Sequence, residues 1–147
     1  MCDPYKPSQT EGVRALTEVV QQYVARCPRT KMIILGFSQV ETTNLQDPDR
    51  LYLLIDWEPV AAIVLMGDPS TTKGQAFHVG SSKGDGIFPH QKPNRCHYVS
   101  GKAVSFCDVG DPFCEAGGHD LSTHMRYVSA AYGQMATDFA VSMFHLA

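Results

Sequence analysis

This chain of 147 residues contains a short apolar run that leads into a serine, in the stretch Lys31-Met32-Ile33-Ile34-Leu35-Gly36-Phe37-Ser38-Gln39. Residues 31–35 form a short run that is apolar on both faces, which is typical of a strand buried in a parallel sheet beneath helices. On a tight turn after such a strand, a serine Oγ is lifted clear of the sheet and the next backbone N–H points toward the same spot. The stretch therefore predicts a buried strand that ends in a turn exposing Ser38.

Two further apolar runs predict more strands of the same sheet. They cover residues 60–66 and, more weakly, residues 103–106. The segment between them, residues 69–95, is rich in Gly, Ser, Lys and Pro and is expected to be a loop with little regular structure. So long a loop is uncommon in a compact domain, which suggests a binding surface.

Helical periodicity marks both ends of the chain. Apolar residues recur every three or four positions over residues 9–26, and Ser8 and Glu11 have the spacing of a capping box at the start of that helix. The same periodicity runs from about Ser122 to the end, which predicts a packed final helix. Helices and strands in this order predict an α/β fold in which a layered sheet has right-handed crossovers.

Length and composition restrict the class of protein. A chain of 147 residues is expected to form a single domain over residues 1–147. The formal net charge is -3 and the basic residues form no block, so nucleic acid is not an expected partner. No apolar run reaches the roughly 18 residues of a membrane span. The first residues also lack the apolar stretch of a secretion signal.

The cysteine content predicts a disulfide. Five cysteines are many for a short chain in a reducing compartment, so at least one disulfide is expected. The odd number leaves at least one thiol over.

A serine needs partners before it can attack an ester. It requires a base that takes its proton and a carboxylate that holds the base in the right tautomer. After the third strand, Asp111 lies between Cys107 and Cys114, and His124 follows at the start of the last helix. The order Ser, Asp, His is that of the α/β-hydrolases. Ser38, Asp111 and His124 are therefore candidates for a catalytic triad.

These residues carry a resemblance to the cutinase family, which includes the acetylxylan esterases. That family has G-Y-S-Q-G at the nucleophile, C-x-x-G-D-x-x-C around the acid and H-x-x-Y at the base. The chain has Gly36-Phe37-Ser38-Gln39, then Cys107 to Cys114 around Asp111, then His124-Met125-Arg126-Tyr127. Cys27-Pro28 before the nucleophile strand and Leu65-Met66-Gly67-Asp68-Pro69 after the next strand also match. The similarity covers nearly the whole chain.

The resemblance implies a fold and a chemistry. The fold would be a three-layer α/β/α sandwich with a mostly parallel sheet. Ser38 would be the nucleophile, His124 the general base and then acid, Asp111 the carboxylate that orients it, and the Gln39 backbone N–H an oxyanion donor. Carboxylic esters, such as cutin or acetylated xylan, would be hydrolysed through an acyl-enzyme without metal or cofactor. The protein would be secreted, and Cys107 would pair with Cys114.

The chain also departs from the family pattern. Val40 stands where the family has glycine. The resemblance places the family's first strands and the second oxyanion donor ahead of the segment that Ser8 begins, and we expect this N-terminal part to be missing. We therefore expect the strand at residues 31–35 to be an exposed edge that can pair with another copy of the chain. We also expect Cys2, Cys27 and Cys96 to be unpaired. A lost oxyanion donor typically costs about 3 kcal/mol in transition-state stabilisation, so turnover could be weak.

Several alternatives remain open from the sequence. Asp108 could replace Asp111, although the family places the acid after the glycine, and His119 could replace His124. Cys107, Cys114, His119 and His124 could instead form a zinc site, but cysteine ligands are usually about two to four residues apart. A non-catalytic interaction module that keeps the motifs is the alternative function.

Overall fold

The computed structural model describes residues 5–38, 58–90, 99–129 and 131–147. The helices are α1 (Tyr5–Arg26), α3 (Leu121–Met125) and α4 (Ala131–Leu146), with a short 3-10 turn at Ser100–Lys102. The strands are β1 (Met32–Phe37), β2 (Val60–Met66), β3 (His78–Val79) and β4 (Ala103–Phe106). The strands predicted at residues 31–35, 60–66 and 103–106 are thus confirmed within one or two residues.

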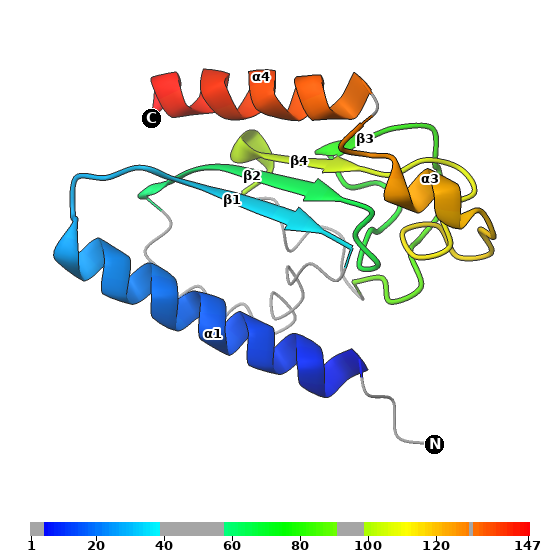
Figure 1. Cartoon of the computed structure of the whole chain (residues 1–147), viewed down its shortest axis with the longest axis horizontal. Coiled ribbons are helices and arrows are strands. Elements are labelled where there is room, and N and C mark those ends of the chain that lie inside the picture. Colours follow the sequence, from blue (N-terminus) through cyan, green and yellow to red (C-terminus); the bar gives the residue numbers. More distant parts are fainter. Residues whose placement is uncertain (1–4, 39–57, 91–98, 130) are drawn as a thin grey trace.

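The strands form one parallel sheet in the order β1-β2-β4-β3. Figure 1 shows α4 on one face of this sheet and α1 on the other, so the predicted three-layer α/β/α arrangement is confirmed. Because all the strands run in the same direction, their carboxyl ends meet at one edge. α3 lies at that edge (Figure 1).

The centre of the sheet holds the core. All seven residues of β2 are buried, because helices cover both faces of a central parallel strand. On the α4 side, Ala136, Ala140 and the half-buried Phe139 and Met143 pack against the sheet at helical spacing. The residues of β2 and β4 that they cover are Ala62, Val64, Met66, Val104 and Phe106. The buried sheet therefore supports the loops that follow β1, β2 and β4.

β1 lies at one end of the described part of the sheet and is only half buried. Met32 and Ile34 pack against the core cluster that contains Val60, whereas Ile33 and Leu35 are exposed. The prediction that this strand is buried on both faces is therefore wrong. The expectation that it forms an edge is confirmed for the described residues.

Two helix predictions also need correction. The first helix includes Tyr5, so Ser8 lies inside it and the predicted capping box is wrong. Glu11 instead accepts hydrogen bonds from Arg14, one turn further along. The predicted final helix is broken between α3 and α4, where the Ser129 N–H and hydroxyl both donate to the Arg126 carbonyl. A serine side chain that binds the backbone in this way competes with helical hydrogen bonds.

The long segment at residues 69–95 is mostly irregular as far as it is described, with β3 as a short strand beside β4. Residues 91–95 lie outside the described part. Among the described residues, no helix is both long enough and apolar enough to cross a membrane.

Candidate active site

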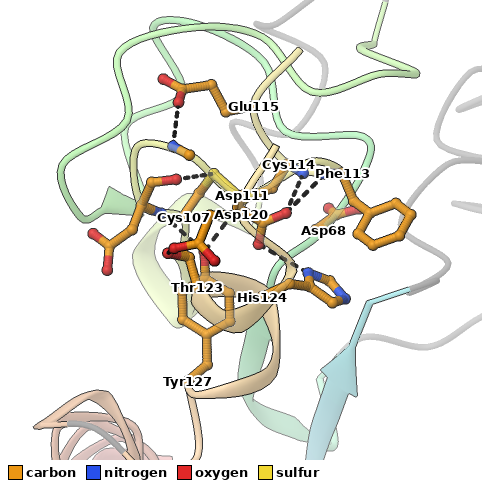
Figure 2. Close-up of polar contacts among 12 residues, drawn as sticks. Asp68, Cys107, Asp111, Phe113, Cys114, Glu115, Asp120, Thr123, His124 and Tyr127 are labelled. Atoms are coloured by element: carbon orange, nitrogen blue, oxygen red, sulfur yellow. Dashed lines mark hydrogen bonds and ion pairs between the residues drawn. A yellow bond between two sulfur atoms is a disulfide. The ribbon is translucent and has the colours of Figure 1, made fainter. Parts of the chain in front are cut away.

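The loops that follow β1, β2 and β4 converge with α3 at the carboxyl edge of the sheet. Open α/β sheets bind their ligands at this edge. Ser38 follows β1, Gly67 follows β2, and the Cys107–Cys114 loop follows β4. Figure 2 shows the loop and the start of α3 facing each other, with Asp111 and His124 between them.

Ser38 has a left-handed backbone conformation in the turn that follows β1. Its φ is 62°, the one positive value at a non-glycine position among the described residues. Such a conformation is strained and persists where the surrounding structure enforces it. Here the Ser38 N–H donates to the Met66 carbonyl at 2.8 Å, which holds the turn against β2. This is the strained strand-end turn that the sequence predicts for an exposed nucleophile.

Gln39 and Val40 lie outside the described residues. The assignment of the Gln39 N–H as an oxyanion donor and the effect of a valine at position 40 therefore stay predictions.

The acid loop is closed by a disulfide between Cys107 and Cys114. Asp111, inside this loop, is fully buried. Its Oδ1 accepts the backbone N–H groups of Phe113 at 2.8 Å and Cys114 at 3.1 Å. Its Oδ2 lies 2.8 Å from Nδ1 of His124. Both carboxylate oxygens are thus fixed, one by the loop and the other by the imidazole.

α3 brings His124 to the carboxylate. Asp120 caps this helix by accepting the Ser122 N–H at 2.9 Å, and its carboxylate also accepts the hydroxyls of Ser122 and Thr123. These hydrogen bonds lower the pKa of Asp120 to about 2. His124 follows in the same turn and is buried. With Asp111 as the carboxylate acceptor, Nδ1 carries the proton, so that Nε2 is the nitrogen able to act as a base.

The His124 ring is held by its neighbours. The Phe113 ring lies 4.5 Å away and the Phe37 ring 5.0 Å away, measured between centroids. On another side, a Cβ at Gly67 would come within 2.7 Å of the imidazole. Because Phe37 directly precedes Ser38, the contact with Phe37 places the imidazole beside the turn that carries the serine. Three segments far apart in the sequence are therefore brought together.

The alternative residues have other roles. Asp108 accepts the Ser81 N–H at 2.9 Å and hydroxyls from Ser81 and Tyr132, each at 2.8 Å. Its carboxylate therefore ties the 80–86 loop to α4. His119 is exposed, and among the described residues no hydrogen bond or ring contact joins it to the site.

The zinc alternative lacks its ligands. The sulfurs of Cys107 and Cys114 are joined to each other, so neither is available as a thiolate. No group of three or more potential metal ligands was found among the described residues. Cys27 is a free thiol, as predicted, while Cys2 and Cys96 lie outside the described residues.

Sequence reasoning missed two neighbours of the imidazole. Gly67 and Tyr127 both contact the His124 ring, although the sequence shows them only as parts of matched motifs. The only sign of them in the sequence was their place in the H-x-x-Y motif and in the motif at the end of the second strand. Their contacts could not be read from it, because they depend on how α3 lies against the end of β2.

Comparison with known proteins assigns the family. A family model described as Cutinase matches residues 2–144. The chain belongs to the cutinase family. Acetylxylan esterase 2 of Talaromyces purpureogenus is 29% identical over 94% of this chain and 63% of its own length. Carboxylesterase Culp1 of Mycobacterium tuberculosis is 28% identical over 95% of this chain and 59% of its own. The chain thus spans about six tenths of the length of these relatives.

Solved structures of the family agree with the fold. The catalytic core domain of acetyl xylan esterase from Trichoderma reesei superposes with a TM-score of 0.84 at 28% identity, covering 95% of this chain and 72% of that one. A cutinase-like protein from Cryptococcus sp. superposes with a TM-score of 0.70 at 19% identity, covering 92% of this chain and 71% of that one. The relatives at 28–29% identity are named as esterases, so they give no support to a non-catalytic interaction module.

Proposed function

We propose that this protein is a serine esterase that hydrolyses carboxylic esters through an acyl-enzyme. The observation that carries the proposal is the buried Asp111–His124 pair, 2.8 Å apart, next to the strained turn that carries Ser38. Membership of the cutinase family and the names of the relatives support the same reaction class.

Each residue has a defined role in the proposed reaction. The Ser38 Oγ attacks the ester carbonyl while Nε2 of His124 takes its proton, and Asp111 keeps the imidazole in the productive tautomer. The Gln39 N–H stabilises the oxyanion. His124 then protonates the leaving alcohol. Water, activated by the same imidazole, hydrolyses the acyl-enzyme and regenerates the serine.

The proposed substrates are neutral esters such as acetylated xylan or cutin. Aromatic rings of Phe37 and Phe113 flank the imidazole, and these apolar neighbours suit an uncharged ester. Acetylxylan esterases and a protein named Cutinase 11 of Verticillium dahliae are among the relatives. We also propose that the protein is secreted, because its disulfide is stable in an oxidising compartment.

Hydrolysis of p-nitrophenyl acetate tests the proposed reaction. The wild-type protein should release p-nitrophenol above the buffer rate, and Ser38→Ala should abolish that excess. Ser142→Ala is the matched control, since Ser142 is exposed on α4, away from the candidate site, and should keep the wild-type rate. Equal rates for wild type and Ser38→Ala would refute the proposal. Acetate release from acetylated xylan, compared with release of hydroxy acids from cutin, would then rank the two substrates.

We further propose that β1 allows two copies of the chain to associate. Leu35 is 70% exposed on this strand, and in the described part of the sheet β1 pairs only with β2. Exposed apolar edge strands are templates for pairing with another chain. Light scattering should show a dimer whose population falls in Leu35→Lys, whereas a monomer at all concentrations would refute this association.

A further inference from the structure

Tyr127 links the histidine segment to both ends of the acid loop. It lies in the turn after α3, three residues beyond His124, and only 1% of its surface is exposed. Its ring meets the His124 ring edge-on, with 6.3 Å between centroids and 88° between planes. From there the side chain reaches the disulfide loop (Figure 2). One residue therefore contacts both the base and the loop that carries the acid.

The hydroxyl of Tyr127 bonds the loop on both sides of Asp111. It accepts the backbone N–H of Asp108 at 2.9 Å. It also lies 3.5 Å from Sγ of Cys114. That sulfur belongs to a disulfide and has no hydrogen, so the hydroxyl must be the donor in this contact. Asp111 sits between the two anchored points.

The electrostatic environment agrees with this geometry. Burial raises the pKa of the Tyr127 hydroxyl; the hydrogen bond from the Asp108 N–H opposes this shift, and the negative charge of Asp111 raises the pKa further. The hydroxyl therefore remains protonated and able to donate throughout the neutral range, next to the carboxylate that orients the imidazole.

We propose that Tyr127 is a positioning residue, whose hydroxyl fixes the Asp111 loop against α3 so that the carboxylate meets Nδ1 of His124. The proposal rests on the serine esterase function proposed above and adds a residue that acts through Asp111. The other groups around His124 cannot replace it. The side chains of Phe37 and Phe113 offer only ring contacts, and Gly67 has no side chain.

Tyr127→Phe removes the hydroxyl and keeps the ring. The matched control is Tyr132→Phe. The Tyr132 hydroxyl also donates a hydrogen bond to the acid loop, at 2.8 Å to the Asp108 carboxylate. Among the described residues no ring contact or hydrogen bond joins Tyr132 to His124. In p-nitrophenyl acetate hydrolysis, Tyr127→Phe should lower kcat by about tenfold or more with KM unchanged, since a small misplacement of a catalytic group costs rate. Tyr132→Phe should leave both constants near wild type.

Proton NMR gives a readout that does not depend on activity. The Nδ1 proton of His124, hydrogen-bonded to a carboxylate, should give a low-field signal in wild type that is absent in Asp111→Asn. This signal should persist in Tyr132→Phe and shift or disappear in Tyr127→Phe. Measurements in sucrose, which favours the folded state, keep the variants comparable.

The two measurements separate the inference from the proposed function. If wild type is active and Tyr127→Phe resembles Tyr132→Phe in kcat and in the NMR signal, the positioning role is overturned and the esterase function stands. If wild type is inactive but Tyr127→Phe loses the signal while Tyr132→Phe keeps it, the positioning of Asp111 stands and the esterase function falls. Failure of Tyr127→Phe to fold even in sucrose would make the hydroxyl a folding determinant and overturn the inference.

Discussion

Gly67→Ala should sharply lower the proposed esterase activity because position 67 has no room for a methyl group beside the imidazole. A Cβ at this position would lie 2.7 Å from both Cε1 and Nδ1 of His124. Carbon atoms in contact prefer separations of about 3.5–4.0 Å, so the ring would have to withdraw by about 1 Å. The Phe37 and Phe113 rings pack against the same imidazole and limit where it can go.

The withdrawal would break the contact that orients the base. The His124–Asp111 distance is 2.8 Å, and an increase of about 1 Å takes it beyond hydrogen-bonding range. A displacement of this size can cost about 100-fold in rate, which is the loss in kcat that we expect. The positive φ of Gly67, 64°, adds roughly 1–2 kcal/mol of backbone strain for alanine.

Gly74→Ala separates these two effects. Gly74 also has a positive φ, 87°, but a Cβ there would have no atom within 4 Å. This variant should lose a similar roughly 1–2 kcal/mol of backbone free energy while keeping the wild-type kcat. Initial rates on p-nitrophenyl acetate and urea unfolding of the three proteins provide the comparison. If Gly67→Ala keeps the kcat of Gly74→Ala, the steric explanation is refuted.

Two further predictions concern the loop that carries the acid. Replacing Cys107 and Cys114 together by alanine removes the cross-link between residues seven apart, so the free energy of unfolding should fall by about 2–3 kcal/mol. Urea titration would show this, and an unchanged midpoint would contradict it. For Asp108, burial alone would raise the carboxyl pKa, but hydrogen bonds from Ser81 and Tyr132 outweigh burial and hold the pKa below 3.8. A lowered folded-state pKa stabilises the fold above the unfolded-state pKa, and this stabilisation is lost as the pH falls through the folded-state value. The advantage of wild type over Asp108→Asn in urea unfolding should therefore be full at neutral pH and shrink below about pH 4. An advantage that is constant from neutral to acidic pH would contradict the assignment.

The sequence was sufficient to predict the strands and the candidate triad. The run at residues 60–66 is apolar throughout because a central strand is covered on both faces, and this pattern is local. Ser38, Asp111 and His124 were recognisable because each follows a strand end or begins a helix within a short motif of fixed spacing. The pairing of Cys107 with Cys114 followed from the same motif and is present in the structure.

Other features were decided by contacts between distant segments. Apolar periodicity continues across the break between α3 and α4, yet Met125 and Val128 in that stretch are exposed, so the periodic pattern predicted one helix where there are two. Asp108 and Asp111 are both carboxylates in the same small loop, and only the packing of α3 shows that Asp111 faces His124 while Asp108 faces Ser81.

The sequence by itself determined the kinds of elements and the order of the chemical groups, because periodicity and short motifs are properties of neighbouring residues. Only the tertiary structure decided which groups touch. Gly67 lies against the imidazole and the Tyr127 hydroxyl against the acid loop because α3 packs on the ends of β2 and β4. Such contacts join residues far apart along the chain, and no local pattern records the distance between them.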